Sequence, residues 1–191
     1  INKLAGLPLD QRQALLDAPF LPFDGMNERG LTVGMAAVPS GGMQSDPNKE
    51  TIDSLMVIRK MLDQAASVDE AVAILQNYNI DWGSGPPLHY LIADRSGRAL
   101  LAEFYQGKLQ FLPNDKPWHL ATNFLRSAVD GSAAGQCARY DRLEGQLSTT
   151  DGSIDAGEAM SLLKDVSQAN TQWSIVYGFS TGDVTVTMGR Q

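Results

Sequence analysis

The segment Asp24-Gly25-Met26-Asn27-Glu28-Arg29-Gly30-Leu31 places a polar amide among turn-forming residues, just ahead of an apolar run. Asp-Gly and Glu-Arg-Gly favour a chain reversal, so a plain turn is one interpretation. Asn27 allows another, because an amide N–H fixed at a strand entrance can donate to a developing oxyanion without adding charge. Met26 and the nearby Met35 are candidates for substrate binding, since methionines suit an apolar acyl pocket, although core packing explains them equally well.

The sequence contains one cysteine, Cys137, and two histidines, His89 and His119. Cys137 is internal and has no free amine, so we interpret it as an unreactive thiol, although the neighbouring Arg139 offers a cation. Both histidines fall in strand-like patterns, which favours structural roles. Such a composition excludes a cysteine-rich zinc site and argues against a multi-histidine centre, so we predict neither a metal nor a cofactor.

The segment Asp24–Leu31 resembles the D-G-M-N-E-[KR]-G-L motif of the choloylglycine hydrolase and penicillin acylase family, which is related to acyl-coenzyme A:6-aminopenicillanate acyltransferases. The likeness extends from about Phe23 to Gln191. Shorter resemblances follow in the family's order at Leu88–Gly97, Glu103, Ala121–Asn123, Ala138–Tyr140 and Thr171–Trp173.

This resemblance implies an N-terminal nucleophile hydrolase, an α+β protein with a four-layer αββα fold of antiparallel sheets between helices. In these enzymes an N-terminal cysteine attacks the substrate amide, and its own α-amino group, with a pKa near 8, acts as the base. The resemblance assigns Asn27 to an oxyanion hole, Asn123 to holding the substrate or the nucleophile's amine, and Arg139 to steadying the charge of the nucleophile.

The family's nucleophilic cysteine, and the arginine and aspartate that follow it, have no counterpart here. Since the chain opens at Ile1 without a methionine, we expect the fold to be incomplete at its N-terminus. The nucleophile would then lie upstream or on a second chain, and this chain alone would be inactive. Three functions stay open: hydrolysis of a linear amide (an N-acyl amine or amino acid, a bile-salt conjugate or a penicillin-like compound), acyl transfer to an amine, and ligand binding without catalysis.

The composition restricts the setting. The 191 residues, 43% of them hydrophobic, suit a single domain over residues 1–191. The net charge of −7 argues against a nucleic-acid partner. No apolar run approaches the roughly 20 residues of a membrane helix. We therefore expect a soluble bacterial protein of the cytoplasm or periplasm, with a small-molecule amide as its partner; self-association stays open.

Periodicity and capping signals predict the elements that would position these residues. Strands joined by hairpins and grouped apart from the helices favour antiparallel sheets with helices layered on them. Residues 39–48 should form a loop beside a cleft. We expect helices at residues 10–16, 51–66, 67–78, 133–147 and 155–168, and strands at 30–38, 88–94, 99–105, 108–112, 118–122, 173–179 and 184–188.

Overall fold

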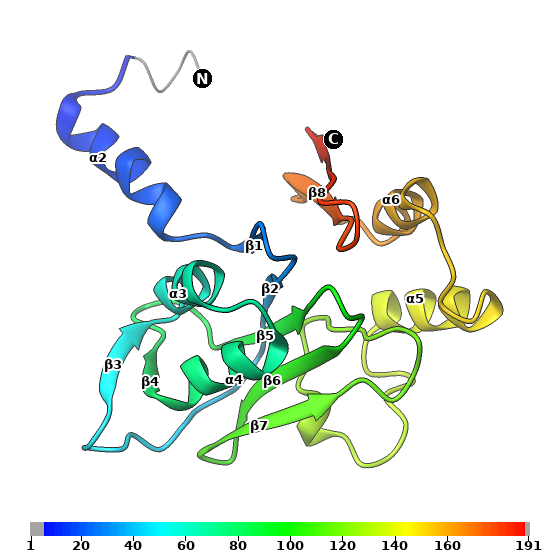
Figure 1. Ribbon diagram of the computed structural model, residues 1–191, viewed down its shortest axis with the longest axis horizontal. Helices are drawn as coiled ribbons and strands as arrows, with labels where there is room; N and C mark the ends of the chain where they lie inside the picture. The colour runs from blue at the N-terminus through cyan, green and yellow to red at the C-terminus, as the bar shows by residue number, and fades with distance from the viewer. Residues whose placement is uncertain (1–5, 190–191) are drawn as a thin grey trace.

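The computed structural model describes residues 6–189, and its largest element is a five-stranded sheet (Figure 1). Each strand runs antiparallel to its neighbour, in the order β1-β2-β5-β6-β7. The strands are β1 (Asp24–Met26), β2 (Thr32–Ala37), β5 (Leu88–Ala93), β6 (Ala99–Tyr105) and β7 (Lys108–Pro113). The predicted strands at 30–38, 88–94, 99–105 and 108–112 are therefore confirmed.

The predicted helix at residues 51–66 begins later than expected. Its first part is a strand, β3 (Glu50–Asp53), which pairs in parallel with β4 (Tyr78–Asp81). The helices α3 (Met56–Gln64) and α4 (Val68–Gln76) form the crossover that a parallel pair requires. The Asp53 carboxylate accepts the N–H groups of Leu55 and Met56, which marks the start of α3. This pair is the exception to the expected antiparallel arrangement.

Helices α3 and α4 cover one face of the sheet and bury the core there. Alternate residues of β5 and β6 point toward them, because side chains alternate between the two faces of a strand. On this face Tyr90 and Ile92 of β5 and Phe104 of β6 are buried. Gly25 of β1 lies so close to α3 that an added Cβ would come within 2.6 Å of Leu62 Cδ1, so the motif's Asp-Gly step lets β1 approach the helix.

The opposite face is covered by an irregular segment and by α5 (Ala138–Thr149). Residues 118–122 were predicted as a strand, but residues 114–125 form no helix or strand. Side-chain bonds rather than a strand ladder anchor this segment: the Trp118 indole donates to Glu144 of α5, and Asn123 donates to the Ala37 carbonyl. The short helix η2 (Arg126–Ala128) follows it.

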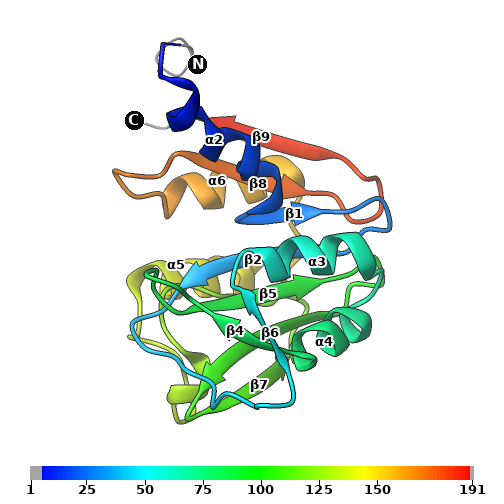
Figure 2. The same cartoon turned by 90° about the vertical axis from the view of Figure 1, so that its left-hand side faces the viewer.

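The C-terminal part forms α6 (Ala156–Asp165) and the predicted hairpin, β8 (Trp173–Tyr177) and β9 (Val184–Met188). Figure 2 shows this hairpin and α6 above β1, on the same side as α2 (Leu9–Asp17) and η1 (Ala18–Phe20). Asp24 of β1 accepts hydrogen bonds from Trp173 and Tyr177, which ties the hairpin to the sheet. No helix in residues 6–189 is long and apolar enough to cross a membrane.

The helices predicted to begin at residues 67 and 155 both start at a capping residue, although one cap differs in detail. Asp155 and Glu158 form a complete capping box at α6. At α4 the Ser67 hydroxyl accepts the Glu70 N–H, whereas the Glu70 carboxylate accepts the N–H of Ala66 instead of that of Ser67. The helix α6 ends at Asp165, three residues before the predicted end.

Candidate active site

Asn123 and Arg139, sixteen residues apart in the sequence, are joined at the end of β2. The Arg139 guanidinium donates to Asn123 Oδ1 at 2.6 Å, and Asn123 Nδ2 donates to the Ala37 carbonyl at 2.7 Å. Asn123 is exposed and Arg139 half-buried. Among the hydrogen bonds of residues 6–189, Asn123 uses one of its two amide hydrogens, so the other is free to meet a ligand.

Cys137 lies beside this pair, at the N-cap of α5. Burial raises the pKa of the thiol, but the Thr122 hydroxyl, the N–H groups of Tyr140 and Arg139, and the Arg139 charge outweigh it, so the pKa is lowered. A lowered pKa favours the reactive thiolate. We interpreted this cysteine from the sequence as unreactive; the Cys-x-Arg spacing at a helix start was the signal for its environment.

Asn27 lies elsewhere. Its amide donates to the carbonyls of Leu62 and Ala65 at the end of α3 and accepts the N–H groups of Arg29 and Leu31. Both amide hydrogens are therefore engaged. Asn27 adjoins the start of β2, whereas Asn123 bonds to its last residue, about 17 Å along the strand. The structure thus separates Asn27 from the Asn123–Arg139 pair and favours a structural role in the turn over the expected oxyanion contact.

Met26 and Met35 point to opposite faces of the sheet. Met35 is paired with Tyr90 and packs against the core under α3 and α4. Met26 is paired with Thr32, on the other face. One pocket cannot be lined by both side chains from these positions, and Met35 serves core packing. A substrate contact stays a prediction for Met26.

Residues 114–128, which we call the Asn123 loop, lie over a fully buried polar pair in the sheet. His89 Nδ1 of β5 lies 3.0 Å from Glu103 Oε1 of β6. The carboxylate also accepts the N–H of Arg126 at 2.9 Å and that of Ser127 at 2.7 Å. Burial alone would raise the pKa of Glu103, but these partners lower it, so the carboxylate is ionised. The sequence signal for this pair was a glutamate inside the apolar run Ala99–Tyr105.

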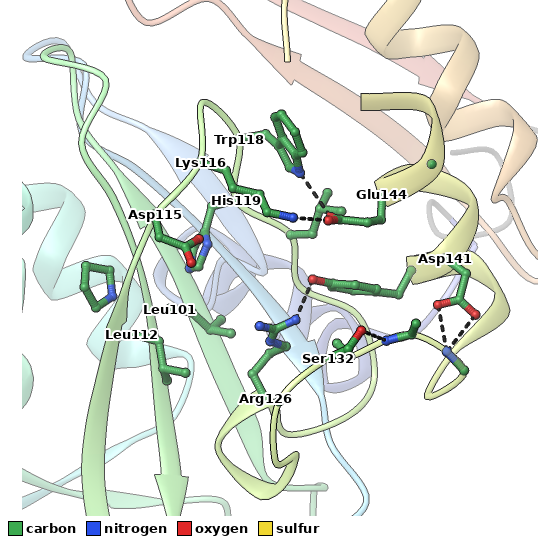
Figure 3. A pocket seen from close by; sticks show the side chains of 18 of the residues that line it. Leu101, Leu112, Asp115, Lys116, Trp118, His119, Arg126, Ser132, Asp141 and Glu144 are labelled. Carbon is green, nitrogen blue, oxygen red and sulfur yellow. Dashed lines mark hydrogen bonds and ion pairs between the residues drawn. The ribbon is translucent and has the colours of Figure 1, made fainter. Parts of the chain in front are cut away.

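A cavity of about 880 Å³ lies between β6, β7 and α5 (Figure 3). Its polar groups are largely engaged with one another: Lys116 and Trp118 both bond to Glu144, and Arg126 donates to the Tyr140 hydroxyl at 2.6 Å. Burial lowers the pKa of His119, which also lines the cavity, so it is neutral at pH 7. Neither Asn123 nor Arg139 lines it, so the cavity and the Asn123–Arg139 pair are distinct features.

Three solved structures have the same fold as this chain. Two are variants of the conjugated bile acid hydrolase from Clostridium perfringens, with TM-scores of 0.65 and 0.63 and identities of 20% and 19%. Each covers 87% of this chain and is matched over 69% of its own length. The third is penicillin V acylase from Agrobacterium tumefaciens, with a TM-score of 0.67 and 18% identity, covering 91% of this chain and matched over 64% of its own length.

These likenesses confirm the expected N-terminal nucleophile hydrolase fold in the α+β class. The sequence comparison identifies the family. The pattern of the linear amide C–N hydrolases, choloylglycine hydrolase family, matches residues 13–123, which is more than half of the 191 residues. The match includes Asn123 and stops before Arg139, whose place in the site comes from its bond to Asn123. The chain belongs to the choloylglycine hydrolase family of linear amide C–N hydrolases.

Proposed function

We propose that the protein hydrolyses the linear amide bond of an N-acyl compound through a thioester on an N-terminal cysteine. The observation that carries the proposal is the Asn123 side chain, held between the Ala37 carbonyl and Arg139 in a chain of this family. Cys137 is internal and lies at the N-cap position of α5. The proposed nucleophile is therefore a cysteine outside the 191 residues.

The chemistry follows from the groups at the site. Attack of a thiolate on the amide carbon forms a C–S bond and moves an electron pair onto the oxygen. Collapse of this intermediate breaks the C–N bond, and the amine leaves with a proton from the nucleophile's α-ammonium group. Water then cleaves the thioester. The free N–H of Asn123 can donate to the oxyanion, and the Arg139 charge favours both the thiolate and the oxyanion.

The proposed substrates are conjugated bile acids or penicillin-like N-acyl compounds. Their support is the pair of structural neighbours, a conjugated bile acid hydrolase and a penicillin V acylase. Met26, on the face of the sheet away from α3, is the proposed apolar contact for the acyl group.

The test uses the full-length gene product with penicillin V and with a conjugated bile acid, and quantifies the released amine by mass spectrometry. Asn123→Ala and Arg139→Ala should each lower kcat/KM by about 100-fold, the usual effect of losing one donor to an oxyanion. Arg142→Ala is the matched control. It lies on the same helix, and its bond is to exposed Asp165 of α6, so its activity should match that of the unmodified protein.

Replacing the N-terminal cysteine with alanine should abolish turnover, and undiminished hydrolysis in that variant would overturn the proposal. Adding an acceptor amine separates hydrolysis from acyl transfer, because transfer places the acyl group on the amine instead of releasing the free acid. Binding of the substrates without turnover by the unmodified protein would identify a catalytically silent relative.

A further inference from the structure

The buried carboxylate of Glu103 holds the loop that carries Asn123. Glu103 is fully buried, and burying a charge is costly unless it is paired and hydrogen-bonded. Oε1 accepts from His89 and from the Arg126 N–H, while Oε2 accepts from the Ser127 N–H. Because an ionised carboxylate can only accept, His89 Nδ1 carries the hydrogen in this contact. Two of the three bonds therefore fix the backbone of a loop.

That loop is connected to the candidate active site at both of its ends. Asn123 lies three residues before Arg126, a span of at most about 10 Å of chain. At Asn123 the loop bonds to Ala37 and Arg139, and at Arg126 the side chain donates to Tyr140, the residue after Arg139. A shift of the backbone at Arg126 would therefore move Asn123 relative to α5.

The pairing of the strands explains how the two sets of contacts are kept in line. His89 of β5 is the register partner of Ala36, the residue before Ala37 on β2. Ala37 supplies the carbonyl that receives Asn123. The acceptor for the Asn123 amide and the histidine that orients Glu103 thus sit on neighbouring strands of one sheet.

On the basis of the function proposed above, we propose that Glu103 is a positioning residue that sets Asn123 in the active site, with His89 orienting its carboxylate. The alternative is a purely structural role, in which loss of the carboxylate costs stability and nothing else. The chain offers a matched control in Asp94, a second buried carboxylate. Asp94 accepts the N–H of Val68, at the start of α4 on the other side of the sheet, and that of Ser96 in the turn between β5 and β6.

The experiment compares Glu103→Gln with Asp94→Asn in the full-length protein. Glutamine keeps the shape of Glu103, but the –NH2 that replaces one carboxylate oxygen cannot accept, so one loop N–H, that of Arg126 or that of Ser127, loses its partner. We expect kcat for amide hydrolysis to fall by about 100-fold with little change in KM, as for a displaced catalytic group. Asp94→Asn should lower the thermal midpoint and leave kcat unchanged.

A second readout does not depend on turnover. The rate of Cys137 alkylation against pH, resolved by peptide mass spectrometry, reports the pKa that Thr122 and Arg139 lower. We expect Glu103→Gln to raise the pH midpoint of this reaction, because Thr122 belongs to the released loop, and Asp94→Asn to leave it in place. A Glu103→Gln protein that matches Asp94→Asn in kcat and in alkylation midpoint would show that Glu103 is only structural.

The outcomes separate this proposal from the proposed function. If the unmodified protein hydrolyses neither substrate, the function fails, and the Cys137 midpoint alone decides the role of Glu103. If Glu103→Gln does not fold, His89→Phe replaces it, since phenylalanine keeps the ring and removes one bond to the carboxylate. A rise in the pH midpoint of Cys137 alkylation in His89→Phe, smaller than that expected for Glu103→Gln, supports the proposal. An unchanged midpoint overturns it.

Discussion

At the scale of single residues, the two asparagines that lie in family-like motifs, Asn27 and Asn123, differ in how many of their amide hydrogens are bonded. Asn123 is exposed, with one engaged amide hydrogen, whereas the Asn27 amide is saturated by four backbone groups. A side chain whose donors are all occupied cannot also donate to a substrate unless those bonds break. Residue type therefore identified two candidates, and hydrogen-bond occupancy separates them.

Asn27→Ala should lower the free energy of unfolding by about 2 kcal/mol, because it leaves partly buried backbone groups of α3 and of the motif turn without partners. Urea unfolding measures this change, while kcat of the folded variant should stay near that of the unmodified protein. Asn48→Ala is the control, since Asn48 is exposed and, within residues 6–189, its side chain bonds to the neighbouring Asp46 alone. A variant with normal stability and a large loss of kcat would instead return Asn27 to the oxyanion hole.

The sequence could point to Asn123 and Arg139 only through their resemblance to family motifs, because their contact joins residues sixteen positions apart, across η2 and the loops on either side of it. The sequence placed Glu103 and His89 correctly on neighbouring strands, but it could not predict which groups the Glu103 carboxylate binds. They include the N–H groups of Arg126 and Ser127, more than twenty residues away from Glu103. Local patterns predict where a side chain lies on an element, and non-local packing decides what it bonds to.

At the scale of elements, local signals succeeded where the chain is stabilised locally. The capping residues Ser67 and Asp155 mark true helix starts. The prediction was wrong for residues 51–55, because Ile52 and Leu55 fit a helical period as well as a strand. What decides the outcome is the parallel pairing of β3 with β4, whose partner residues lie 28 positions later, as in Thr51 with Asn79.

Asp24→Asn should loosen the C-terminal hairpin without loosening the central sheet. The Asp24 carboxylate receives both Trp173 and Tyr177 of β8, so its charge fixes the hairpin to β1. Amide hydrogen exchange should quicken in β8 and β9 by about tenfold and stay unchanged in β5 and β6. Glu28→Gln, an exposed residue of the same motif, provides the charge-matched control. Equal exchange in both variants would show that other contacts hold the hairpin.

The same bonds affect how Tyr177 titrates. Burial, and then the hydrogen bond and charge of Asp24, raise the pKa of the Tyr177 phenol. A raised pKa in the folded state means that this contribution to stability is present below the ordinary tyrosine pKa of about 10 and is lost as the pH rises above it. The hydrogen bond from Tyr177 of β8 to Asp24 of β1 is therefore an alkali-sensitive contact between the C-terminal hairpin and the five-stranded sheet.

At the scale of the whole molecule, two buried carboxylates attach the layers on either side of the sheet. Asp94, just after β5, holds the start of α4 on the helix-covered face. Glu103, in β6, holds the Asn123 loop on the opposite face. The sheet thus positions the core helices on one face through the Asp94 carboxylate and the candidate active site on the other face through the Glu103 carboxylate.

These carboxylates make the fold sensitive to acid. Burial would raise the pKa of each, but hydrogen bonds from His89, Ser127 and Arg126 lower that of Glu103, and bonds from Ser96 and Val68 lower that of Asp94. In the unfolded chain Glu103 takes up its proton near pH 4.5 and Asp94 near pH 3.8. Below these values the unfolded state binds more protons than the folded state, so stability falls as the pH falls.

We therefore expect the free energy of unfolding, measured with urea, to decline slightly below about pH 6.5, where His119 of the unfolded chain binds a proton, and more steeply below about pH 5, where the two carboxylates do. Glu103→Gln should be less stable at neutral pH and should show a shallower decline from pH 4.5 downward, because glutamine has no proton to bind. In Asp94→Asn the decline of the free energy of unfolding should become shallower only at lower pH, near the pKa of 3.8 of the free aspartate. If the free energy of unfolding falls equally steeply below about pH 5 in the unmodified protein, Glu103→Gln and Asp94→Asn, the two carboxylates do not hold the layers. The acid sensitivity would then come from surface charges.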